Sequence, residues 1–369
     1  MSRAPALRLR RKDRWGAVVN MVISFIPVVV FAVSIGAIGC ASSQNPVTST
    51  SSGVDVVRDA PYSIRIGGEP GSGRYGFVDR AGNTLIPPIY DDPMPDNPRY
   101  HFSEGLAAVR LDGLWTYIDA TGKTVIETEF TQPGDFHDGL AAIGNYGLGE
   151  LRGYIDKTGR VVIPLRFDDA GDFSEGLAGV RIGGSWGFID TGGEWAVTPR
   201  FESVRPFSSG LAAVETAGKW GYVDRTGEFI IQPQYEEASC FAEGLAVVKK
   251  GSYGYIDPQG RVVVGFRFED ASAFSGGLAA VRTNDQYGYI DKTGAVVIPA
   301  QYYWAAAFED DLAVVGDSRH MYGIIDREGR RVWELDMPEA NTLPGNVARL
   351  VREDYSEFLI DSSGRKIWP

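Results

Sequence analysis

The sequence has little cysteine, little histidine and a deficit of positive charge. Its 369 residues include 2 cysteines and 3 histidines. Two cysteines cannot form a disulfide framework, and His101, His137 and His320 lack the spacing of metal ligands. The 36 Lys and Arg residues against 48 Asp and Glu give a formal net charge of −12, which disfavours contact with nucleic acid. We therefore expect no metal, no cofactor and no nucleic-acid partner.

Glycine and aromatic residues are what the chain has in excess. It contains 46 glycines, and 12% of its residues are aromatic. Average glycine usage is roughly 7%, and aromatic residues are enriched in strands. Many short strands joined by tight turns account for both features, so the composition predicts an all-β protein.

Residues 1–39 predict an export segment. Six basic residues and one acid fall within residues 1–14, and residues 16–38 carry no charge. A basic stretch before an apolar run is typical of an export signal. The run ends with Gly39-Cys40, which resembles the bacterial lipoprotein signal. That resemblance implies cleavage before Cys40 and lipidation of Cys40.

A single uncleaved membrane anchor is the alternative for residues 1–39. About 20 apolar residues suffice to span a bilayer, and the run is long for a signal segment. Both interpretations leave the rest of the chain exported and attached to the membrane, in the cell envelope. Residues 40–60 are rich in Ser and Thr and are interpreted as a flexible tether. Residues 61–369 then form the folded domain.

The dominant feature of residues 61–369 is an internal repeat. An aspartate followed three residues later by glycine recurs nine times, at spacings of 33 to 40 residues. These aspartates are Asp79, Asp119, Asp156, Asp190, Asp224, Asp257, Asp291, Asp326 and Asp361. A second marker in phase with the first, Phe-x-x-Gly-Leu-Ala, begins at Phe102, Phe136, Phe173, Phe207, Phe241 and Phe274. Self-similarity at this period indicates tandem structural units.

An aromatic residue and a glycine precede most of the repeated aspartates. The pair is Trp-Gly at Trp186 and Trp220, and Tyr-Gly in four other copies. Arg152 and Glu357 depart from the pattern at the aromatic position, and Thr116 replaces the glycine. This pattern resembles the bacterial WG-repeat family over most of the chain. The resemblance implies a repeat fold and no shared catalytic motif.

The unit is interpreted as three short strands and a closing segment. The Gly-Leu-Ala marker begins the first strand, the aromatic pair lies in the second, and Val161–Ile163 is a third strand that Pro164 ends. A three-stranded unit cannot bury its own apolar side chains and must stack on the next one. Propellers usually have about 4–8 blades of four strands. We therefore predict nine units stacked as an open β-solenoid, with propeller-like closure as the alternative.

Three local motifs fail the tests for catalysis or calcium binding. Residues 71–76 match a dinucleotide fingerprint and residues 183–187 match a serine-nucleophile motif. Both require a following helix, whereas the repeat predicts a following strand. One aspartate in each Asp-x-x-Gly turn is too few for Ca²⁺. We predict no catalytic residues, and the chain is not expected to be an enzyme.

The row of rings at the aromatic position is the one candidate binding feature. Its members are Trp115, Trp186, Trp220, Tyr253, Tyr287 and Tyr322. Rings at a fixed repeat can stack on sugars, as in the aromatic-repeat wall-binding modules that the units resemble. Burial of the rings between units is the structural alternative. The glycine beside each ring is expected to leave room for a ring of the neighbouring unit.

These features predict a non-catalytic binding or scaffold protein tethered in the cell envelope. Its partner is expected to be an envelope protein, with a cell-wall glycan as the alternative. Acids recur around the Phe marker, as in Asp168, Asp169, Asp172 and Glu175. Repetition turns such positions into rows of charge, which favour cationic or neutral partners.

Overall fold

The computed structural model describes residues 61–66, 73–91, 100–145 and 150–369. Every helix or strand in these residues is a β-strand, which confirms the all-β prediction. No helix in this part of the chain is long and apolar enough to cross a bilayer. The export segment, the lipidation of Cys40 and the tether at residues 40–60 lie outside the described residues.

The strands form nine antiparallel sheets. Two sheets have three strands each: β1 (Tyr62–Ile66), β2 (Arg74–Val78) and β3 (Thr84–Tyr90); β4 (Leu106–Leu111), β5 (Leu114–Asp119) and β6 (Thr124–Glu127). Seven sheets have four strands each: β7 (Gln132–His137), β8 (Leu140–Gly144), β9 (Arg152–Asp156) and β10 (Val161–Phe167); β11 (Asp169–Ser174), β12 (Leu177–Ile182), β13 (Ser185–Asp190) and β14 (Trp195–Phe201); β15 (Ser203–Val204), β16 (Ala212–Thr216), β17 (Lys219–Val223) and β18 (Phe229–Tyr235); β19 (Glu237–Ala238), β20 (Ala246–Lys250), β21 (Ser252–Ile256) and β22 (Val262–Phe268); β23 (Asp270–Ala271), β24 (Leu278–Thr283), β25 (Gln286–Asp291) and β26 (Val296–Tyr302); β27 (Trp304–Ala305), β28 (Leu312–Gly316), β29 (Tyr322–Asp326) and β30 (Arg331–Met337); β31 (Glu339–Leu343), β32 (Val347–Val351), β33 (Glu357–Asp361) and β34 (Lys366–Trp368).

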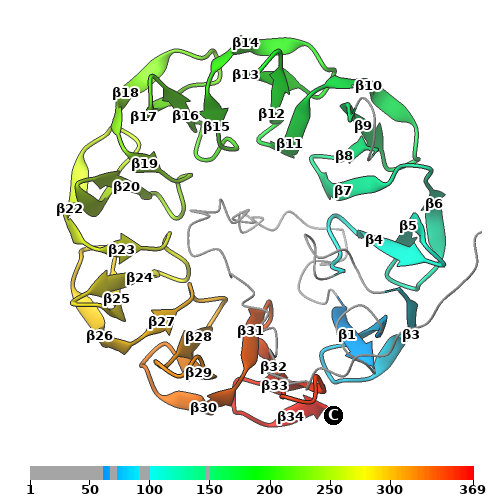
Figure 1. The fold of residues 1–369 in the computed structure, drawn as a ribbon, viewed down its shortest axis with the longest axis vertical. Helices are drawn as coiled ribbons and strands as arrows, with labels where there is room; N and C mark the ends of the chain where they lie inside the picture. Colours follow the sequence, from blue (N-terminus) through cyan, green and yellow to red (C-terminus); the bar gives the residue numbers. More distant parts are fainter. Residues whose placement is uncertain (1–60, 67–72, 92–99, 146–149) are drawn as a thin grey trace, which may run out of the picture. The chain divides into compact units, whose positions relative to one another are not determined.

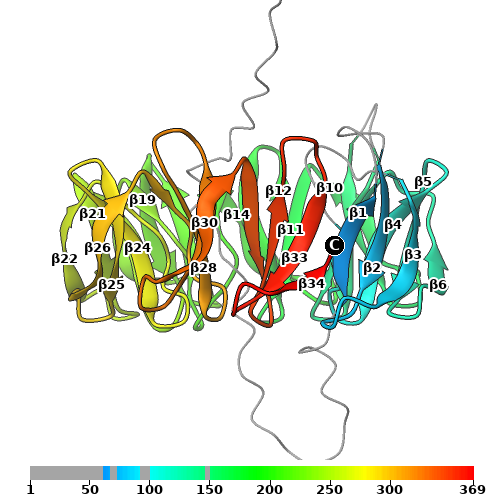
Figure 2. The same ribbon diagram turned by 90° about the horizontal axis from the view of Figure 1, so that it is seen from below.

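Each four-stranded sheet is an up-and-down meander, whose strands we name A to D in chain order. Strand A is the innermost and strand D the outermost strand of its sheet (Figure 1). The A–B and C–D turns lie at one face of the ring of sheets, here called the turn face. The B–C turns and the links between sheets lie at the opposite face (Figure 2).

The ring is closed between its first and last sheets. The Tyr62 hydroxyl donates to the Pro344 carbonyl at 2.8 Å, and Tyr62 and Ile64 share an apolar cluster with Val347 and Leu359. The open solenoid is therefore wrong, and the sheets are the nine blades of a β-propeller, which was the alternative. An open stack would leave the apolar faces of both end sheets in water, and closure buries them.

The unit has four strands in seven of the nine sheets, not the three expected. The additional strand A comes from the segment before the Phe marker, and in β7 and β11 it includes the marker phenylalanine. Strands β15, β19, β23 and β27 contain only two residues each. Two residues are too few for an alternation of apolar and polar positions, so strand A has no pattern in the sequence of these four sheets.

Proline does not end the outer strand. Strand β10 continues through Pro164 to Phe167, and β14 and β18 pass through Pro199 and Pro233 in the same way. Strand D is the edge of its sheet, where a residue without an N–H group removes no inter-strand hydrogen bond.

The glycine beside the aromatic residue makes room for strand D of its own sheet, not for a neighbouring ring. A Cβ on Gly187 would lie 2.5 Å from the Val197 carbonyl oxygen and 2.8 Å from the Pro199 nitrogen. The register of β13 against β14 shifts at this point, where strand D bulges. Thr116, which replaces the glycine, pairs directly with Glu127 at the end of the short strand β6.

Apolar side chains pack between neighbouring sheets. One cluster joins Trp220 and Tyr222 of β17 to Phe241 and Val248 of the next sheet. A buried tyrosine hydroxyl also donates to a backbone carbonyl of the next sheet at 2.7–2.8 Å in five places: Tyr117 to Gly134, Tyr154 to Gly171, Tyr222 to Ser239, Tyr255 to Ser272 and Tyr289 to Ala306. These bonds fix the rotation of each sheet relative to its neighbour.

The Asp-x-x-Gly turns are capped as the sequence predicts. The Asp156 carboxylate accepts the N–H groups of Thr158 at 2.9 Å and Arg160 at 3.2 Å. Gly159 has φ of 84°, and a Cβ there would lie 2.7 Å from the Ile126 side chain. Glycine is therefore required both by the turn and by its close approach to strand D of the preceding sheet.

Candidate functional site

The six rings of the predicted aromatic row lie at the interfaces between sheets. Trp220, Tyr253 and Tyr287 are buried, with 6–8% of their surface exposed. The other three are half-buried and pack against inter-sheet clusters; they are Trp115, Trp186 and Tyr322. Burial of the rings between repeat units, the structural alternative, accounts for these positions. Stacking of the rings on a glycan stays a prediction.

Charged side chains hold several of these rings in place. The Arg205 guanidinium lies 5.3 Å from the ring centre of Trp220, and the Lys249 ammonium lies 5.0 Å from that of Tyr253. The Tyr253 hydroxyl donates to Glu237 at 2.8 Å, and Lys249 pairs with the same carboxylate at 2.9 Å. Burial, reinforced by the hydrogen bond to Glu237, raises the pKa of Tyr253.

Several acids near the Phe marker accept backbone N–H groups of turns. Glu175 accepts the Gly210 N–H at 2.9 Å, and Glu243 accepts the Gly277 N–H at 3.0 Å, in each case from the next sheet. Glu202 caps a turn of its own sheet through two N–H groups. These carboxylates serve the fold, which the sequence pattern alone does not distinguish from a row of free charges.

Four ionisable side chains, His101, Asp135, His137 and Asp172, form a different arrangement, which we name the inner cluster. Asp135 and His137 belong to β7, Asp172 belongs to β11, and His101 precedes β4. His101 Nε2 lies 2.8 Å from Asp135 Oδ2, and His137 Nε2 lies 3.7 Å from Asp172 Oδ2. The Asp172 side chain is 52% exposed, and that of Asp135 is 22% exposed. The cluster therefore links three consecutive sheets at the inner edge of the ring, where β7 and β11 lie (Figure 1).

Two carboxylates and two imidazoles in this arrangement influence one another's ionisation. Partial burial raises the pKa of Asp172; His137 and His101 oppose the increase, and Asp135 adds to it. Within the described ranges, no group of three or more His, Cys, Asp or Glu side chains could hold a metal ion. The two carboxylates give the cluster acidic groups that can attract a cationic side chain.

The inner cluster was missed in the sequence because its histidines share no spacing in the chain. Alignment on the Phe marker gives the signal: His101, Asp135 and Asp172 all stand one residue before it. The next repeats have Pro206 and Cys240 at this position. Histidine or aspartate thus precedes the marker phenylalanine in three neighbouring sheets only, among the copies that have this phenylalanine.

The two apparent catalytic motifs lie where the repeat predicts. Residues 183–187 span the turn between β12 and β13, so no helix follows the serine. Strand β2 follows residues 71–73 of the dinucleotide-like sequence. Neither segment has the strand-to-helix geometry that its motif requires.

Similarity to solved structures concerns the fold alone. A structure described as a eukaryotic initiation factor has a TM-score of 0.57 and 12% identity, and the alignment covers 84% of this chain and 94% of that one. BamB from Moraxella catarrhalis has a TM-score of 0.44 and 11% identity, over 71% of this chain and 95% of that one. Comparison with curated proteins finds no match.

A family match follows the repeat itself. The WG containing repeat matches seven times, at residues 75–115, 115–148, 153–186, 186–220, 220–252, 253–287 and 287–316. Where the aromatic position marks both ends, as in residues 186–220, a match runs from strand C of one sheet to the start of strand C in the next. Since the matches cover well over half of the chain, this protein belongs to the WG containing repeat family.

Proposed function

We propose that this protein is a non-catalytic scaffold of the bacterial cell envelope that binds a basic segment of a protein partner at the inner cluster. The observation that carries the proposal is that acids near the Phe marker have two different kinds of contact. Glu175 and Glu243 cap turns, whereas Asp135 and Asp172 contact histidines of the cluster. A basic side chain of a ligand can replace these histidine contacts without removing a turn cap seen in the described residues.

Charge and position support a basic protein segment over a glycan. The cluster spans three sheets and contains partly exposed carboxylates, which attract lysine and arginine side chains. The glycan alternative depends on exposed ring faces, and Trp220, Tyr253 and Tyr287 are buried. A closed ring of sheets also holds the three inner segments at fixed separations, which lowers the entropy lost on binding.

The binding site is tested by isothermal titration of the folded domain with an oligolysine peptide. We expect the double variant Asp135→Asn and Asp172→Asn to bind about tenfold more weakly, because each lost charge removes an attraction at short range. The matched control, Glu194→Gln with Glu228→Gln, removes two exposed acids from C–D turns and should leave the affinity unchanged. Binding should also weaken as salt is raised.

Two results would reject this site. One is an equal loss of affinity in both double variants, which would mean that only the overall charge matters. The other is saturable binding of N-acetylglucosamine oligomers with none of oligolysine, which would favour the glycan alternative.

Attachment to the membrane is a separate part of the proposal. Replacement of Cys40 by Ser should abolish fatty-acid labelling and cleavage of the precursor, if the lipoprotein resemblance holds for residues 1–40. Continued cleavage and labelling would reject lipidation at Cys40. Membrane association without either would favour the uncleaved anchor.

A further inference from the structure

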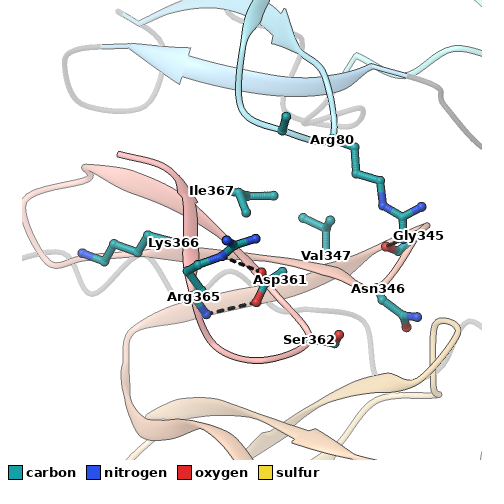
Figure 3. A pocket seen from close by; sticks show the side chains of 10 residues that line it. Arg80, Gly345, Asn346, Val347, Asp361, Ser362, Arg365, Lys366 and Ile367 are labelled. Carbon is teal, nitrogen blue, oxygen red and sulfur yellow. Dashed lines mark hydrogen bonds and ion pairs between the residues drawn. The ribbon is translucent and has the colours of Figure 1, made fainter.

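A pocket of about 720 Å³ lies on the turn face at the junction of the first and last sheets (Figure 3). We name it the seam pocket. Arg80 and Ala81 of the β2–β3 turn line one side, and residues 345–347 before and at the start of β32 line another. The rest of the lining comes from the turn between β33 and β34 and the start of β34, at residues 361, 362 and 365–367. This volume is within the range of about 300–1,000 Å³ that is common for small-molecule sites.

The lining is cationic in a chain whose net charge is −12. Arg80, Arg365 and Lys366 contribute three positive charges, and Asp361 is the one acid of the lining. The Asp361 carboxylate is already engaged, because it accepts the Ser363 N–H at 2.9 Å and the Arg365 Nε–H at 3.0 Å. An excess of positive charge therefore remains.

Several donors of the pocket have capacity for a ligand. Arg365 uses its Nε for Asp361, so its terminal nitrogens remain, and its side chain is 78% exposed. Arg80 donates one terminal nitrogen to the Gly345 carbonyl and retains its other donors. Figure 3 shows both guanidinium groups beside the pocket, with the Ser362 hydroxyl at its lower edge. Arginine groups of this kind bind phosphate and carboxylate through paired hydrogen bonds.

The other junctions explain why charge accumulates here. Lys157 and Lys292 occupy the place of Arg80 in later repeats, and each pairs with a carboxylate of the preceding sheet, Glu104 at 3.1 Å and Glu243 at 3.0 Å. The preceding A–B turn at the seam offers Arg80 only the Gly345 carbonyl. Among the ion pairs of the described residues, none neutralises Arg80.

Two acids of the neighbouring sheet, Asp310 and Asp311, contact lining residues of the pocket and are occupied by these contacts. The Asp310 carboxylate accepts the Gly345 N–H, and Asp311 accepts the Asn346 side-chain N–H at 2.9 Å. Asp311 also lies 3.8 Å from Arg327. In the part of the chain that the structure describes, neither Asp310 nor Asp311 forms an ion pair with Arg80 or Arg365.

We propose that the seam pocket binds a small anion-bearing ligand, whose phosphate or carboxylate group is held by Arg80 and Arg365. The two arginines belong to the first and last sheets, so the bound ligand bridges the closure of the ring. This site is distinct from the inner cluster and does not depend on the proposed partner.

The proposal is tested by titration of the folded domain with glucose 6-phosphate, glucuronic acid, inorganic phosphate and neutral glucose. Arg365→Gln should weaken binding of the charged probes by about tenfold or more. Its matched control is Arg330→Gln, since Arg330 bonds Asp326 in the same way one sheet earlier and does not line the pocket. Arg80→Gln has an equivalent control in Arg225→Gln, because Arg225 donates to the Glu175 carbonyl at another junction and does not line the pocket.

A second measurement separates binding from folding. A ligand that bridges the seam should raise the melting temperature and slow hydrogen exchange in β1 and β34. The variant Ser362→Ala should weaken binding without opening the ring. Tight binding of phosphate with weak binding of glucuronate would identify the bound group as a phosphate. Tight binding of glucuronate with weak binding of phosphate would identify it as a carboxylate. Three results would overturn the proposal. They are an equal loss of affinity in Arg365→Gln and Arg330→Gln, binding of glucose as tight as that of glucose 6-phosphate, and no saturation up to about 10 mM.

Discussion

The Glu357 carboxylate accepts the backbone N–H of Arg65, across the junction of the last and first sheets. Glu357 stands where most repeats have an aromatic ring, so this departure from the repeat is explained by ring closure. Its carboxylate also pairs with Arg349 at 3.1 Å, and both side chains are almost completely buried.

Replacement of Glu357 by Gln should open the seam. Loss of one partner of a buried ion pair costs about 3–5 kcal/mol, and we expect the low end because Glu339 also lies 3.1 Å from Arg349. Urea unfolding should show the loss, and hydrogen exchange should increase first in β1. Glu328→Gln, at an exposed pair with Arg330, should cost under about 0.5 kcal/mol. Full stability of the Glu357 variant, or faster exchange far from the seam, would contradict this prediction.

The buried tyrosine hydroxyls offer a reciprocal test. Tyr255→Phe leaves the Ser272 carbonyl without its donor and should cost about 1–2 kcal/mol in thermal or urea unfolding. Phe188 occupies the same place in another repeat, so Phe188→Tyr should be neutral or stabilising if its hydroxyl reaches the next sheet. A loss above about 2 kcal/mol in the Phe188 variant would show that this interface has no space for the hydroxyl.

The glycine beside the aromatic residue should not tolerate a side chain. Gly187→Ala places a Cβ 2.5 Å from the Val197 carbonyl oxygen and should cost about 1–3 kcal/mol by displacing strand D. Gly265 in β22 is the control, since a Cβ there meets nothing within 4 Å. Alanine at Gly265 should be neutral or slightly stabilising. Equal unfolding midpoints for the two variants would refute the account given for Gly187.

Acid should weaken the Asp-x-x-Gly turns. Threonine hydroxyls and turn N–H groups lower the pKa of Asp119, Asp156, Asp224 and Asp291 below 3.8. A lowered folded-state pKa stabilises the fold above the unfolded value, and this stabilisation is lost as pH falls through the folded-state pKa. Urea midpoints between about pH 5 and pH 2 should therefore decrease towards low pH. The decrease should be shallower in Asp291→Asn; a flat profile in the parent protein would be inconsistent with these turns.

The local structure of the repeat was predictable from sequence, and the closure was not. Asp156 and Gly159 recur in every unit, and each has a physical role within a few residues of its neighbours. Glu357 and Arg65 occur once and are 292 residues apart, so periodicity gives no signal for their contact. The inner cluster was obscured in a similar way, because His101 and Asp172 share a position in the repeat but not a residue type.

The family match is offset from the sheets, since residues 186–220 run from strand C of one sheet to strand C of the next. Duplication of one such segment would supply strands C and D to one sheet and strands A and B to the following sheet. It would thus add one complete blade and one complete interface, with no half-sheet left over. Tyr62, Arg65 and Glu357 lie outside the matched residues. The number of blades can therefore change during evolution while the contacts that close the ring are inherited intact.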